Sequence, residues 1–128
     1  MAATGLRRGD GRARLHRIAG ARVAFEPFTR ASVTSLQAWF RAGAALERDG
    51  QRGAAHFLEH LLFQEQPARF GGRGLGAVIE DAGGTVNAWT SHDHVVVHAT
   101  VPSASFDSAL AAVTTCVLGA CPAPEVVE

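Results

Sequence analysis

The sequence contains no lysine and no tyrosine, and all twelve of its basic residues are arginine. Twelve acidic residues balance them, so the chain has no general electrostatic attraction for nucleic acid or for an anionic membrane surface. No stretch approaches the roughly 20 apolar residues of a membrane span. The start of the chain lacks the apolar core of a secretory signal, which predicts a cytoplasmic protein.

Cysteine is scarce, with only Cys116 and Cys121 near the C-terminus. No second cysteine pair or suitably spaced histidine accompanies them, so they do not predict a metal knuckle. Two thiols in a reducing compartment and a local disulfide are both compatible with their spacing. The length of 128 residues and the 47% of hydrophobic residues fit one globular domain.

Two imidazoles and a carboxylate occur within five residues, as His56, Glu59 and His60. In a helix, at about 100° per residue, the two histidines point in similar directions and Glu59 stays on the same half of the cylinder. Two imidazole nitrogens one turn apart can bind a divalent metal, most often zinc. Glu59 is then placed to take a proton from water at the metal. The pattern H-x-x-E-H indicates metal-assisted hydrolysis, although two surface histidines on an amphipathic helix also produce it.

The residues before this motif predict a leader followed by strands. Residues 1–14 are rich in glycine and arginine without periodicity, and we expect a flexible leader. Residues 15–18 and 23–25 flank a turn and predict a hairpin. Residues 33–42 alternate as a strand does. The face of this strand that we expect to be buried consists of Leu36, Ala38, Phe40 and Ala42.

The motif itself predicts a helix over residues 51–64, with Asp49 as its N-cap. Its apolar residues would pack on a sheet and leave the motif side chains on a flank that faces a cleft. The expected apolar stripe consists of Ala54, Phe57, Leu58, Leu61 and Leu62.

Glycines crowd the following linker, but no G-K-[ST] or G-x-G-x-x-G pattern accompanies them, which argues against nucleotide binding. A short helix over 75–82 ending at Gly83 is expected, then strands over 85–90 and 95–101. The linker glycines are Gly71, Gly72, Gly74 and Gly76.

Three histidines near the second of these strands share one parity, as His92, His94 and His98. They form either the polar face of a sheet or a second metal site. A final helix over 103–118 is expected, capped by Ser103. Its apolar period consists of Phe106, Leu110, Val113 and Val117.

The order of these motifs resembles the N-terminal part of the pitrilysin-type (M16, inverzincin) zinc metallopeptidases. The resemblance covers residues 15–128, which we expect to be a truncated N-terminal portion of such a domain. The matching segments are residues 32–36, 41–43, 47–48, 55–63, 79–80, 83–84, 87–91, 93–94 and 101–102.

This resemblance implies roles for individual residues. His56 and His60 would be zinc ligands, and Glu59 would be the general base. Asn87 and Ala88 match the edge strand along which family members align a peptide substrate through backbone hydrogen bonds. Asn87 is equally compatible with an ordinary strand-end residue.

The sequence departs from the family pattern at the third zinc ligand. Family members supply it from a glutamate that, counted from His60, would lie past Glu128, and Glu125 and Glu128 fall several residues short. Family members also use a second, related half to complete the active site, and this half is absent from the 128 residues.

The predicted fold is α+β, with an antiparallel or mixed sheet packed against helices on one face. The predicted function is a zinc-dependent endopeptidase that acts on peptides or proteins and needs a longer chain or a complementing M16-like subunit. The alternatives are a non-catalytic binding or assembly subunit and a fragment without independent function. Neither nucleic acid nor a membrane is an expected partner.

Overall fold

The computed structural model describes residues 12–18, 20–28, 30–64 and 67–118. The chain divides into two compact units, Met1–Ser32 and Val33–Glu128. In the first unit β1 (Arg14–Ile18) pairs antiparallel with β2 (Ala21–Phe25), as the hairpin pattern predicts. Residues 1–11 of the predicted leader (1–14) lie outside the described residues. Arg14, the last residue of that leader, belongs to β1.

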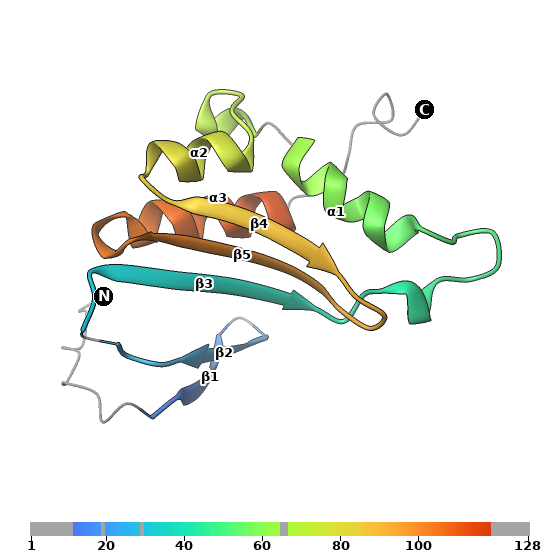
Figure 1. Ribbon diagram of the computed structural model, residues 1–128, viewed down its shortest axis with the longest axis horizontal. Coiled ribbons are helices and arrows are strands. Elements are labelled where there is room, and N and C mark those ends of the chain that lie inside the picture. Colours follow the sequence, from blue (N-terminus) through green and yellow to red (C-terminus); the bar gives the residue numbers. More distant parts are fainter. Residues whose placement is uncertain (1–11, 19, 29, 65–66, 119–128) are drawn as a thin grey trace. The chain divides into compact units, whose positions relative to one another are not determined.

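The second unit contains a three-stranded antiparallel sheet (Figure 1). It consists of β3 (Val33–Phe40), β4 (Thr85–Thr90) and β5 (Val95–Pro102), in the order β3-β5-β4. The β5 segment takes the central place because its run of valines suits a strand that is covered on both faces. The alternation predicted for residues 33–42 is confirmed in β3, but the strand ends at Phe40 instead of Ala42.

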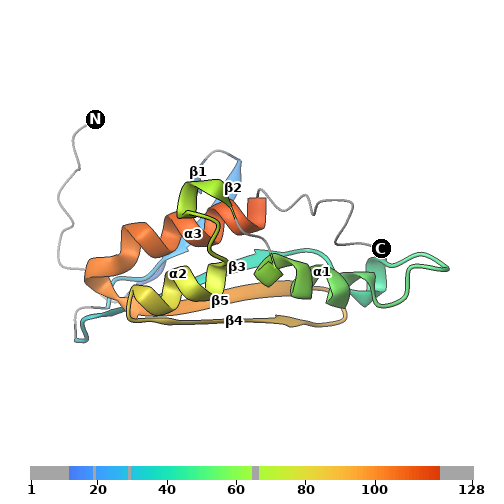
Figure 2. The ribbon, with the colours of Figure 1, turned by 90° about the horizontal axis from the view of Figure 1, so that it is seen from above.

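Three helices cover one face of this sheet (Figure 2). They are α1 (Ala54–Gln64), α2 (Leu75–Asp81) and α3 (Phe106–Leu118). The α+β class with helices on one face is therefore confirmed. Within the described residues, no helix combines the length and the apolar character needed to cross a membrane.

The core lies between the helices and this face of the sheet. Leu75 and Ile79 of α2 and Val97 of β5 are fully buried there. The α3 helix contributes Ala109, Ala112, Val113 and Cys116.

The buried faces of two helices differ from those that the sequence predicts. In α1 the residue buried in the first turn is Ala55, and Leu58 remains 38% exposed. In α3, Val113 is buried as predicted, but Leu110 is 40% exposed. Ser103 does not cap α3, because it begins a separate 3-10 turn and its hydroxyl lies 3.0 Å from the Thr34 hydroxyl of β3.

The other face of the sheet carries two tryptophan side chains over its central strand. Trp39 of β3 and Trp89 of β4 stand on either side of Val96 in the strand register. Their rings meet edge to face with centroids 5.8 Å apart, and Val96 beneath them is completely buried. The tryptophans themselves remain 57% and 40% exposed.

Candidate metal centre

The N-terminus of α1 is held by a carboxylate from the preceding loop. Glu47 accepts hydrogen bonds from the backbone N–H of Gly53 at 2.8 Å and of Ala55 at 2.9 Å. The bond from Ala55, and then the bond from Gly53, keep the pKa of the Glu47 carboxyl below its usual range. The prediction that Asp49 caps this helix is wrong, since the helix begins five residues later and Glu47 satisfies its first amides.

The two histidines of α1 face each other. Their Nε2 atoms are 3.2 Å apart, and their ring centroids are 4.6 Å apart. Two nitrogens that bind one zinc at 2.0–2.1 Å with a tetrahedral angle lie roughly 3.4 Å apart. His56 and His60 therefore fit as two ligands of one zinc ion.

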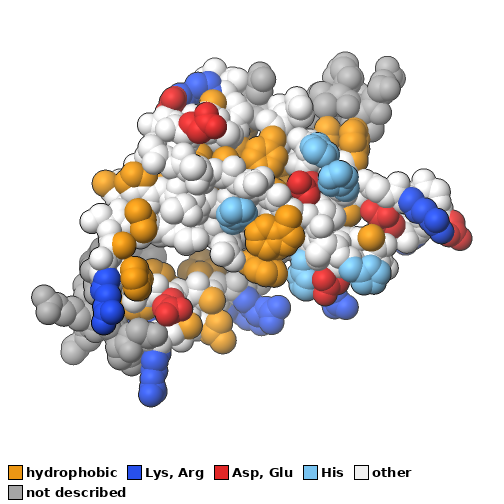
Figure 3. All heavy atoms as spheres, in the orientation of Figure 1, with side chains coloured by type: hydrophobic (Ala, Val, Ile, Leu, Met, Phe, Trp, Pro, Cys, Tyr) orange, Lys and Arg blue, Asp and Glu red, His pale blue; other side chains and the backbone are white. Residues whose placement is uncertain are grey.

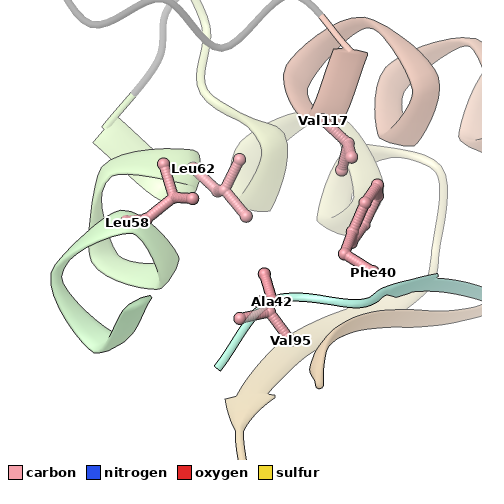
Figure 4. Close-up of a pocket in the computed structure, with 6 residues that line it drawn as sticks. All are labelled: Phe40, Ala42, Leu58, Leu62, Val95 and Val117. Carbon is pink, nitrogen blue, oxygen red and sulfur yellow. The ribbon is translucent and has the colours of Figure 1, made fainter. Parts of the chain in front are cut away.

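Both histidines are open to solvent. Each is exposed, and Figure 3 shows paired histidine side chains on the surface where Figure 1 places α1. The apolar hollow of about 160 Å³ drawn in Figure 4 lies between α1, α3 and the sheet, and none of the three motif side chains lines it. It is lined by Phe40, Ala42, Leu58, Leu62, Val95 and Val117.

Glu59 is oriented by a residue of the sheet. The Thr90 hydroxyl, at the end of β4, donates a hydrogen bond of 2.5 Å to Oε2 of Glu59. Both side chains are half-buried, whereas the neighbouring histidines are exposed. The carboxylate of Glu59 thus contacts the outer strand of the sheet.

The outer edge of β4 carries the two residues that the resemblance assigns to substrate. The Ser91 amide donates to the His94 carbonyl at 2.8 Å, which continues the β4–β5 ladder. In an antiparallel ladder every second residue bonds to its partner, so the amide and carbonyl of Ala88 and of Thr90 point to the outer edge. Within the described part of the chain no strand pairs with that edge.

Asn87 occupies part of this edge. Its Oδ1 accepts a hydrogen bond of 2.9 Å from the Ala88 amide. One outward amide is thereby satisfied by a side chain that can rotate away. Asn87 itself lies on the exposed side of the strand, opposite His98 of β5.

The β4–β5 turn holds a second polar cluster. Asp93 Oδ1 lies 2.9 Å from Nδ1 of His94, and this hydrogen bond keeps the pKa of the Asp93 carboxyl below its usual range.

The ring of His98 packs against Trp89, with centroids 5.3 Å apart, and that of His94 packs against Trp39, with centroids 5.7 Å apart. The described residues contain no group of three or more histidine, cysteine or carboxylate side chains arranged to hold a metal, so the second metal site is not found.

The motif helix brings His56 and His60 together, but among the described residues it too belongs to no group of three or more such side chains that could hold a metal. Glu125 and Glu128 lie outside the described residues, as does Cys121. Cys116 is buried in the core.

The family model for insulinase, peptidase family M16, matches residues 22–120. The chain belongs to peptidase family M16. It is 38% identical over 91 residues to a probable mitochondrial-processing peptidase subunit beta of Arabidopsis thaliana, which covers 71% of this chain and 17% of that protein. It is 34% identical over 108 residues to an uncharacterised zinc protease of Mycobacterium bovis, and the match covers 84% of this chain and 24% of that protein.

Solved structures show the same fold. Pitrilysin superposes with a TM-score of 0.73 at 19% identity over 86% of this chain and 12% of its own. A protease from Helicobacter pylori superposes with a TM-score of 0.71 at 24% identity, over 78% of this chain and 24% of its own. This M16 chain therefore spans about a quarter or less of the length of these relatives.

The sequence indicates the motif residues, but it indicates neither the contact of Thr90 with Glu59 nor the capping role of Glu47. The parity of Thr90 with Ala88 gave a partial signal, because it places Thr90 on the helix-covered face. Nothing in the sequence indicated that α1 would cross that end of β4.

Proposed function

We propose that this chain carries the zinc-binding and water-activating part of an M16 zinc-dependent endopeptidase. His56 and His60 are the proposed ligands, and Glu59 is the proposed general base. The observation that supports this most is the 3.2 Å separation of the two Nε2 atoms, with the Glu59 carboxylate held on the same helix.

The residues of the chain divide the chemistry between them. When bound, zinc supplies the Lewis acidity that makes water a nucleophile near neutral pH. One oxygen of Glu59 is engaged by Thr90 and the other is left to accept the proton of that water and pass it to the departing amine. The exposed position of the histidine pair leaves room for a substrate carbonyl beside the carboxylate.

The outer edge of β4 is the proposed track for the peptide. An extended peptide can add to this edge as a further strand, with its own carbonyl replacing Oδ1 of Asn87 on the Ala88 amide. The edge ends at Thr90, whose side chain contacts Glu59, so a peptide on β4 passes the base. Asn87 and Ala88 are therefore proposed to align the scissile bond.

The proposed site needs a third zinc ligand from outside the described residues, and it needs a cover. The relatives are several times longer than this chain, and the mitochondrial-processing peptidases among them are named as beta subunits. Both facts support completion by a longer chain or by a complementing M16-like subunit. A closed chamber would also exclude water from the histidine pair, which is exposed here.

The test uses the affinity-tagged protein isolated from its own cells together with whatever it assembles with. Hydrolysis of quenched fluorescent peptides and zinc content are measured for the wild type and for Glu59→Gln. Loss of a proton-transfer group costs about 10²–10⁴-fold in rate. We expect Glu59→Gln to lose activity by that factor and to keep its zinc.

The alternative, a non-catalytic assembly subunit, predicts a different result. The lack of a third ligand among the described residues favours this alternative. If peptide hydrolysis is absent, or is the same with Glu59→Gln, the endopeptidase proposal is wrong, and the chain is either a binding subunit or a fragment without independent function.

A further inference from the structure

We propose that Thr90 is a positioning residue that fixes the carboxylate of Glu59 and links it to the peptide-binding edge of the sheet. This inference rests on the proposed function, because it assigns a partner to the proposed base. It adds a residue of β4 to a site that is otherwise built on α1.

The first observation is the hydrogen bond itself. The Thr90 hydroxyl donates to Oε2 of Glu59 at 2.5 Å, across 31 positions of sequence. Hydrogen bonds to a charged acceptor are stronger than neutral ones, and partial burial limits competition from water. A glutamate side chain has three rotatable torsions, so this bond removes orientations in which the carboxylate would swing away from the histidine pair.

The second observation is the dual position of Thr90. Its side chain faces α1, whereas its backbone amide and carbonyl point to the outer edge, by the alternation that the Ser91–His94 bond establishes. One residue therefore contacts the base through its side chain and is available to a peptide through its backbone. A peptide that adds to β4 is placed at a fixed distance from Glu59 because both are attached to the same residue.

The strand offers a matched comparison. Thr85 lies in the same strand as Thr90 but has the opposite parity, so its side chain is on the exposed face away from α1. Replacing either threonine by valine keeps the shape and the preference for a strand while removing the hydroxyl. Only Thr90→Val removes a contact with Glu59.

The first measurement requires no activity. Urea unfolding of the full chain in the presence of a chelator is compared for the wild type, Thr90→Val, Glu59→Ala and the double variant, because alanine removes the acceptor of the Thr90 hydroxyl whereas glutamine would keep one. A hydrogen bond to a charged acceptor changes the folding equilibrium by about 10- to 150-fold. We expect Thr90→Val to cost about that factor in the wild type and much less when residue 59 is already alanine, which offers no acceptor. Equal costs in both backgrounds would overturn the proposal.

The second measurement uses the isolated assembly. We expect Thr90→Val to lower kcat about 10- to 100-fold, with little change in KM and no change in zinc affinity. Thr90→Ser should restore kcat, because serine keeps the hydroxyl. Thr85→Val should leave kcat, KM and zinc affinity unchanged. An unchanged kcat for Thr90→Val in an assembly with Glu59-dependent activity would overturn the positioning role. An assembly without Glu59-dependent activity would refute the proposed function instead, and the unfolding comparison would then decide whether Thr90 holds Glu59.

Discussion

Gly84 sets the distance between α2 and the sheet, and its substitution provides a sharp test of the fold. It stands between the end of α2 and the start of β4, and its amide donates to the Ile79 carbonyl at 2.9 Å. A Cβ atom at Gly84 would lie 2.5 Å from the Thr100 carbonyl oxygen and 2.5 Å from Cγ1 of Val101. Both atoms belong to the central strand, which is paired on both edges and cannot shift without disturbing the register.

The expected cost follows from these contacts. Overpacking of a close-packed interior costs about 1–3 kcal/mol, so Gly84→Ala should lower the free energy of unfolding by that amount. Gly76, in the first turn of α2, is the matched control because a Cβ there would meet nothing within 4 Å. Gly76→Ala should raise the free energy of unfolding by about 0.5–1 kcal/mol through reduced backbone entropy.

Thermal and urea unfolding measure both changes. For a unit of this size, each kcal/mol shifts the Tm by about 4–8 °C, so the two variants should move in opposite directions by several degrees. If Gly84→Ala is as stable as the wild type, the close approach of α2 to the central strand is not as described.

Two further predictions concern α1. Glu47 has a folded-state pKa below 4.5, so its carboxylate stabilises the fold above that pH and the contribution is lost as the pH falls through the lowered value. In urea unfolding, Glu47→Gln should therefore be less stable than the wild type at neutral pH and nearly as stable as the wild type in acid. A loss of stability that is the same at neutral and acid pH would contradict this. Zinc at about 100 times its Kd should stabilise the wild type by about 2.7 kcal/mol. A chelator should reverse this stabilisation, and His60→Ala should abolish it. An equal rise of Tm in His60→Ala would show that zinc binds elsewhere.

Strands were predictable where composition left few alternatives. The run Val95, Val96 and Val97 forms a strand because β-branched residues suit a strand and no helix period competes with it. The helix of the motif was also predictable, since His56 and His60 come together through local geometry alone.

The buried face of α1 was not predictable, because apolar residues occupy more of the helix than one face can bury. Ala54 and Ala55 are equivalent in the sequence, and the approach of the helix to the sheet decides that Ala55 is covered. The contact of Glu59 with Thr90 depends on that same approach. A pattern within the helix carries no information about it, so the sequence indicates Glu59 as the expected base but does not indicate Thr90 as its hydrogen-bond partner.

The outer edge of β4 also has a consequence for the behaviour of the isolated chain. A row of outward amides and carbonyls is a template on which a strand from another molecule can grow into an aggregate. Asn87 blocks the Ala88 amide with its own side chain, so an intruding strand must first displace a bond that is already made. The residue proposed to receive a peptide also protects the edge from unwanted pairing while no peptide is bound.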